Sequence, residues 1–174
     1  MGELFNSIIK GLFRRVSETV IVEGFNPAGS LNSRRNERIM NEIFMIAPRF
    51  SNAGGIYCDE ENYDWLIIPQ YPLPEKWHER WAKLMIVFPK MYPETPPIGF
   101  YLNQKFHLKA GGYDSHATGT AYHGAPDLLQ SGWHWYCVTV VEGAGGWSPS
   151  SDYSNPDNLW TYLNMVRESL TNDF

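Results

Sequence analysis

After the Gly54-Gly55 pair the chain breaks into short apolar runs, and this pattern limits the possible folds more than any other feature. Each run is as long as an ordinary β-strand and is bounded by proline, glycine or charged residues. Because the connections between successive runs are short, they favour an antiparallel meander. The predicted strands are residues 56–58, 65–68, 84–88 and 98–102.

Segments with helical periodicity lie on both sides of these runs. One helix is predicted over residues 33–47, starting at Ser33 with Asn36 or Glu37 near its cap. The other covers residues 156–171, with Asn155 as its cap and Pro156 in the first helical position. A chain of 174 residues suits one such domain. We therefore predict a single α+β domain over residues 33–174, built on a four-stranded antiparallel sheet.

Residues 1–32 precede this domain and follow a different pattern. Apolar residues recur at helical spacing over residues 3–17, which predicts an amphipathic helix, and the glycine- and proline-containing residues 19–32 resemble a linker. Few basic residues adjoin the apolar stripe, so packing on this domain or on a sister subunit is favoured over a membrane surface. The oligomeric state is left open. The stripe consists of Leu4, Phe5, Ile8, Ile9, Leu12, Phe13 and Val16.

Composition excludes several classes of function. Acidic residues outnumber basic ones by 19 to 14, which gives a net charge of −5, so no nucleic-acid partner is expected. No apolar run approaches the ~20 residues that span a bilayer, so no membrane partner is expected either. Two cysteines cannot form a disulfide framework, and no signal peptide is recognisable at the start, which favours the cytoplasm. Cys58, inside a predicted strand, is expected to be an inert thiol.

Residues 107–135 are rich in glycine and histidine and show no regular pattern, and loops of that length are usually functional. Cys137 follows directly, between an aromatic segment and a run of valines. A cysteine in such a setting is by itself most often a small buried hydrophobe. Further motifs are therefore needed to assign it a chemical role.

These motifs occur in order along the chain. Phe88-Pro89 is followed by the turn Tyr92-Pro93-Glu94-Thr95-Pro96-Pro97, then by Phe106-His107, by Cys137 and by Trp147-Ser148-Pro149. In this order and spacing they resemble the ubiquitin-conjugating enzymes and their UBC fold, and the chain looks like a divergent prokaryotic-type member. Two features depart from the family pattern. Leu108 and Lys109 stand where the family has proline and asparagine, and residues 107–135 contain an insertion of about 20 residues.

The resemblance implies a reaction and a set of partners. Cys137 would accept the carboxyl end of a ubiquitin-like protein from an adenylate-forming activating enzyme, hold it as a thioester, and pass it to an amine of a target protein. The chain would need no cofactor, since its partner consumes the ATP. Related prokaryotic systems suggest a role in antiviral defence. Partners would dock at residues 33–47 and at the turn containing Pro93, Pro96 and Pro97, while Trp147 and Pro149 would hold the active loop.

The missing asparagine leaves the oxyanion of the transfer step without its usual donor. Histidine can donate a hydrogen bond or accept the proton of the amine, and we favour His134, three residues before Cys137. Asp152 matches an acidic position that orients the incoming lysine in similar proteins, although it could equally be a turn residue that binds its own backbone. The other candidate donors are His107, Lys109, His116, Tyr122 and His123.

Three alternative functions stay open. An inactive module of the same fold could simply bind a ubiquitin-like protein or its activating enzyme. A thiol peptidase would pair Cys137 with a histidine and an orienting Asn or Asp, but the sequence shows no signature for one. Zinc binding is not expected, because the spacings of 9, 7, 11 and 3 between the four histidines from His107 onward and Cys137 match no common finger.

Overall fold

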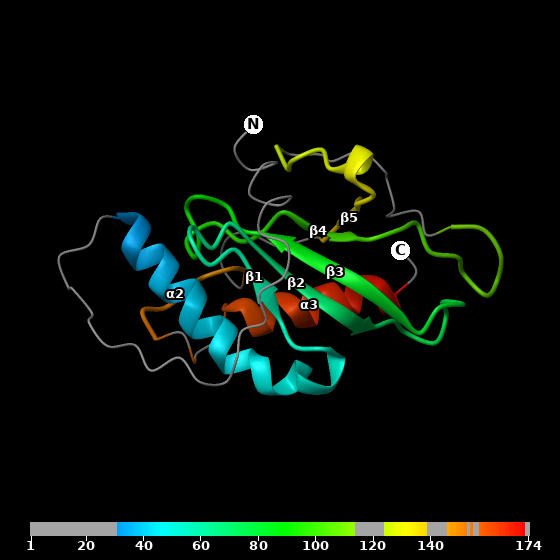
Figure 1. Ribbon diagram of the computed structural model, residues 1–174, viewed down its shortest axis with the longest axis horizontal. Helices are drawn as coiled ribbons and strands as arrows, with labels where there is room; N and C mark the ends of the chain where they lie inside the picture. Colours follow the sequence, from blue (N-terminus) through cyan, green and yellow to red (C-terminus); the bar gives the residue numbers. More distant parts are fainter. Residues whose placement is uncertain (1–30, 114–123, 139–145, 153, 155–156, 173–174) are drawn as a thin grey trace.

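The computed structural model describes residues 31–113, 124–138, 146–152, 154 and 157–172. In this part of the chain, five strands form one sheet in the order β1-β2-β3-β4-β5, with every neighbouring pair antiparallel (Figure 1). The predicted α+β class and meander are confirmed. The strands are β1 (Tyr57–Cys58), β2 (Trp65–Pro72), β3 (Trp81–Val87), β4 (Gly99–Leu102) and β5 (His134–Cys137).

The prediction of four strands is wrong, because His134–Cys137 pairs with β4 as a fifth strand. Half of β5 lies in the stretch that was expected to be irregular. Trp135 and Tyr136 are both buried, one on each face of the sheet, so this strand lacks the alternation of apolar and polar residues that marks a half-exposed strand. A four-residue segment without that alternation is recognised as a strand only by its pairing with β4.

Two helices, α2 (Leu31–Ile46) and α3 (Leu159–Thr171), cover one face of the sheet in the described residues (Figure 1). A short 3-10 helix, η1 (Ala47–Ala53), continues α2. The apolar stripes of both helices pack on the inward side chains of β2, β3 and β4 and form the main core. None of the helices in the described ranges is long and apolar enough to cross a bilayer.

The predicted helix boundaries need correction. The first helix begins at Leu31, so Asn36 and Glu37 lie inside it, because periodicity marks the packed face and does not locate the first turn. The closing helix begins at Leu159, and Asn158 is its cap, accepting a hydrogen bond from the Thr161 N–H at 3.0 Å. The predicted cap Asn155 and first residue Pro156 lie outside the described residues, but a helix running on from them is excluded because Asp157 has a φ of 66°, outside the right-handed helical region.

The opposite face of the sheet carries a second cluster, here called the outer cluster. It is covered by the segment around the short 3-10 helix η2 (Leu129–Ser131), which lies on the far side of the sheet from α2 and α3 (Figure 1). The Tyr101 hydroxyl donates to the Pro126 carbonyl at 2.7 Å and fastens this cover. The predicted helix 3–17 and part of the insertion lie outside the described residues. The outer cluster consists of Trp65, Ile67, Met85, Tyr101, Leu128 and Trp135.

Candidate active site

Cys137 is the last residue of β5 and lies directly across from Gly99, the first residue of β4. Its side chain is half-buried and packs at the margin of the outer cluster, on the same face as Trp135. The Ser169 hydroxyl of α3 donates to the Cys137 carbonyl at 3.0 Å. The sulfur therefore sits at an edge of the sheet, on a backbone that is fixed from both sides.

Desolvation raises the pKa of the Cys137 thiol above its usual value. Cys58 on β1 is buried, and desolvation raises its pKa to about 12. The thiol of Cys137 is therefore protonated at neutral pH, but it is the more accessible and the more acidic of the two.

We expect the alkylation rate of Cys137 by iodoacetamide to increase about tenfold per pH unit and to continue rising beyond pH ~8.5, the usual thiol pKa. The reason is that a raised pKa postpones formation of the reactive thiolate. The rate is measured by mass spectrometry of a Cys58→Ser variant, which reports Cys137 alone. A plateau near pH 7 would contradict the raised pKa.

Gly99 makes the approach of β5 to β4 possible. A β-carbon at this position would lie 2.5 Å from the Tyr136 carbonyl oxygen and 2.6 Å from two atoms of the Trp135 indole. The ring of Trp135 therefore lies over Gly99, the residue that pairs with Cys137. No side chain larger than hydrogen fits without displacing the backbone of β5.

Gly99→Ala is expected to destabilise the fold by about 1–3 kcal/mol, because a backbone oxygen must move to admit the methyl group. Urea unfolding followed by tryptophan fluorescence measures this change. The exposed Gln104→Ala, just beyond the end of β4, serves as the control and should change stability by less than about 0.5 kcal/mol. Equal stability of the two variants would mean that β5 can move away freely.

The proline turn and the Trp147-Ser148-Pro149 motif are brought together in the structure. The Trp147 indole N–H donates to the Pro93 carbonyl at 2.7 Å, and the rings of Tyr92 and Trp147 lie 6.4 Å apart. Pro96 and Pro97 are buried. The proline turn immediately precedes Gly99 in the chain, so this assembly borders the strand end that faces Cys137.

A buried carboxylate that sequence reasoning missed ties the assembly to the helices. Glu42 on α2 has no exposed surface, and it accepts hydrogen bonds from the Arg38 guanidinium, the Tyr92 hydroxyl and, at 2.7 Å, the Leu159 N–H. Arg38 in turn donates to the Ser150 carbonyl at 2.6 Å. One sequence signal could have revealed that Glu42 is buried, because it lies on the same helical stripe as Ile39, Ile43 and Ile46.

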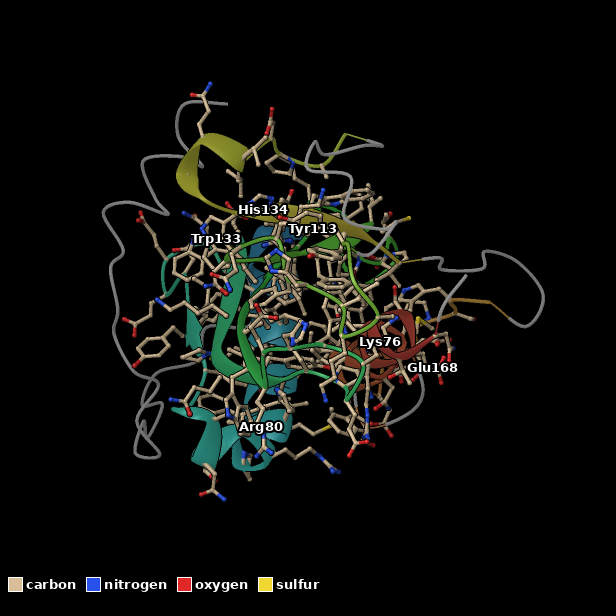
Figure 2. All side chains as sticks on the ribbon, turned by 90° about the vertical axis from the view of Figure 1, so that its right-hand side faces the viewer. Lys76, Arg80, Tyr113, Trp133, His134 and Glu168 are labelled. Atoms are coloured by element: carbon tan, nitrogen blue, oxygen red, sulfur yellow. The ribbon has the colours of Figure 1, made fainter. Side chains whose placement is uncertain are left out.

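His134 is not brought to the sulfur. Side chains alternate along a strand, so His134 and Cys137, three residues and about 10 Å apart, point to opposite faces of the sheet. Its neighbours are Lys105 and the end of β4, where it pairs with Leu102. Desolvation and the charge of Lys105 lower the pKa of His134. Figure 2 shows it at the same end of the molecule as Trp133 and Tyr113.

His107 and Lys109 lie past the carboxyl end of β4, whereas Cys137 faces its amino end. Both are exposed. The His107 ring lies 4.6 Å from that of Tyr113, and its Nδ1 is 3.8 Å from a Glu79 carboxylate oxygen. His116, Tyr122 and His123 lie outside the described residues.

Asp152 is exposed on the loop after Trp147, and its carboxylate accepts hydrogen bonds from the Ser154 N–H at 2.9 Å and the Ser154 hydroxyl at 2.7 Å. These bonds lower the pKa of Asp152, with a smaller contribution from the charge of Arg38.

Among the residues that the structure places, no three His, Cys, Asp or Glu side chains gather as a metal site would require.

Comparison with known proteins identifies one family. A family model described as "Prokaryotic E2 family E" matches residues 56–173, which include the five strands of the described residues and α3. No curated protein matches the chain. No solved structure matches it either.

Proposed function

Because the chain belongs to prokaryotic E2 family E, we propose that it carries a ubiquitin-like protein as a thioester on Cys137 and transfers it to an amine of a target protein. Family membership associates the chain with ubiquitin-like conjugation and, in general terms, with a modifier and an activating enzyme as partners. The thioester chemistry and the choice of Cys137 are the proposed part.

The position of Cys137 is the observation that carries this proposal. Of the two cysteines, Cys58 is buried in the main core, whereas Cys137 is half-buried at a sheet edge. Gly99, its cross-strand partner, is the second residue after Pro97, so Cys137 pairs with the strand end into which the proline turn leads. A nucleophile that must receive and release the tail of another protein needs such an edge position.

The chemistry proceeds in two steps. The Cys137 thiolate attacks the activated terminal carbonyl of the modifier, so that a C–S bond forms and the bond to the activating group breaks. An amine then attacks the same carbon, loses a proton to a base or to water, and expels the thiolate. The raised pKa means that few molecules hold the thiolate at neutral pH, but a thiolate of higher pKa is intrinsically more nucleophilic.

We assign to Asp152 the role of attracting and orienting the incoming amine. It is exposed, its lowered pKa keeps it ionised at neutral pH, and it lies on the loop that Arg38 fastens through the Ser150 carbonyl. A carboxylate near the thioester would attract a lysine ammonium group and orient it. His134 is not included in the proposal, because it points to the other face of the sheet.

The test combines the purified chain with its activating enzyme, its ubiquitin-like protein and Mg-ATP. A reductant-sensitive adduct of one modifier per chain should form within minutes, visible on non-reducing gels and by intact-mass measurement. Tight association of the modifier without any adduct would instead support the inactive binding module. The sequence gives one argument for that module, because Lys109 stands where the family has the asparagine that donates to the oxyanion.

A further inference from the structure

A groove of about 530 Å³ lies along α3, away from the proposed active site. Its floor is formed by Phe50, Tyr71 and Leu163, all of which are buried. One wall is the segment Pro72 to Glu75, which begins at the last residue of β2. The other wall is the outer side of α3, where Trp160, Asn164, Arg167 and Thr171 recur at helical spacing.

The groove and Cys137 use different sides of α3. Ser169, which binds the Cys137 carbonyl, is two residues from both Arg167 and Thr171 and therefore projects about 160° away from them around the helix. An occupant of the groove would leave the sulfur uncovered.

Two arginines give the groove a positive rim. The Arg49 guanidinium lies 4.2 Å from the centre of the Trp160 ring, at one end of the groove, and Arg167 lines it two turns further along α3. Seven residues of helix separate Trp160 from Arg167, which corresponds to about 10 Å. Both arginines are exposed, and within the described residues neither forms an ion pair. This positive rim contrasts with the net charge of −5 of the whole chain.

We infer that the groove binds an extended peptide segment of a partner protein, in which a bulky apolar residue is flanked by two carboxylates. The apolar side chain would contact Phe50, Tyr71 and Leu163, while the carboxylates would pair with Arg49 and Arg167. Side chains on one side of an extended chain recur at every second residue, so the acidic residues stand at positions i and i+4, about 13 Å apart, with the apolar residue between them at i+2. Glu75 on the opposite wall disfavours a third acidic residue between them.

The inference is tested with the full chain alone, without ATP or an activating enzyme, so its outcome is separate from that of thioester formation. The probe is a fluorescein-labelled peptide, Gly-Glu-Ser-Phe-Ser-Glu-Gly, and the comparison peptide carries lysine in place of both glutamates. Fluorescence anisotropy at low salt should show the acidic peptide binding at least about tenfold more tightly than the basic one, and this preference should weaken as salt is added.

The double variant Arg49→Glu/Arg167→Glu should reverse the preference, while the control charge reversal Lys83→Glu, on the other face of the sheet, should leave it unchanged. Both variants alter exposed residues, and circular dichroism checks that they fold. Binding of neither peptide, equal binding of both, or an unchanged preference in the double variant would overturn the inference.

Discussion

Replacing Cys137 with serine is expected to eliminate the reductant-sensitive adduct and to reduce transfer of the modifier by about 10³-fold or more. A serine hydroxyl is far less nucleophilic than a thiolate at neutral pH, and an ester on serine would resist the reductant that releases a thioester. The measurement is single-turnover transfer of the modifier to free lysine, followed on non-reducing gels. The fold should be unaffected, because the two side chains are nearly isosteric and the Ser169 hydroxyl binds the backbone of residue 137.

The matched control is Cys58→Ser, which changes the buried thiol on β1. This variant should retain the adduct, although a hydroxyl in an apolar site is expected to lower stability by about 1–2 kcal/mol. If the adduct survived in Cys137→Ser and disappeared in Cys58→Ser, the assignment of the nucleophile would be wrong. Loss in neither variant would place the linkage on another residue.

Glu42→Ala is expected to lower the free energy of unfolding by about 3–5 kcal/mol, since it leaves the buried Arg38 cation without its counter-charge. The same change removes the acceptor for the Tyr92 hydroxyl and the Leu159 N–H. For a chain of this size the melting temperature should fall by roughly 10 °C. Urea unfolding and thermal melting both measure the effect.

Two variants separate the charge from other effects of truncation. Glu37→Ala, on the same helix and only partly buried, should change stability by less than about 0.5 kcal/mol. Arg38→Met combined with Glu42→Leu removes both charges and should recover much of the loss, because no lone charge is left in the core. A loss below about 1 kcal/mol in Glu42→Ala would show that water or a shifted Arg38 compensates for the missing carboxylate.

The family and the general fold could be predicted from the order of the motifs along the chain. Proline turn, Phe-His pair, cysteine and Trp-Ser-Pro are local patterns, and the runs of apolar residues that became β1 to β4 have the length and boundaries of strands without any partner. The pattern predicted α+β architecture because the same apolar periodicity that defines a strand or a helix also defines the face it buries.

The site was only partly predictable. Cys137 could be singled out by its place among the motifs, but its exposure and its contact with Ser169 depend on α3, 22 or more residues further along the chain. His134 was favoured because it is close in sequence, and the strand places it on the wrong face. A separation of three residues in the sequence does not show whether two side chains point the same way until the backbone conformation is known.

What the sequence determined by itself is the set of elements with a strong local period and the ordered motifs that identify the family. What only the tertiary structure decided is the pairing of β5 with β4, the burial of Glu42 among three donors, and the groove beside α3. The physical reason is that period and turn chemistry are properties of neighbouring residues. Strand partnership, the neutralisation of a buried charge and the shape of a groove arise from residues far apart in the chain, which meet only when it folds.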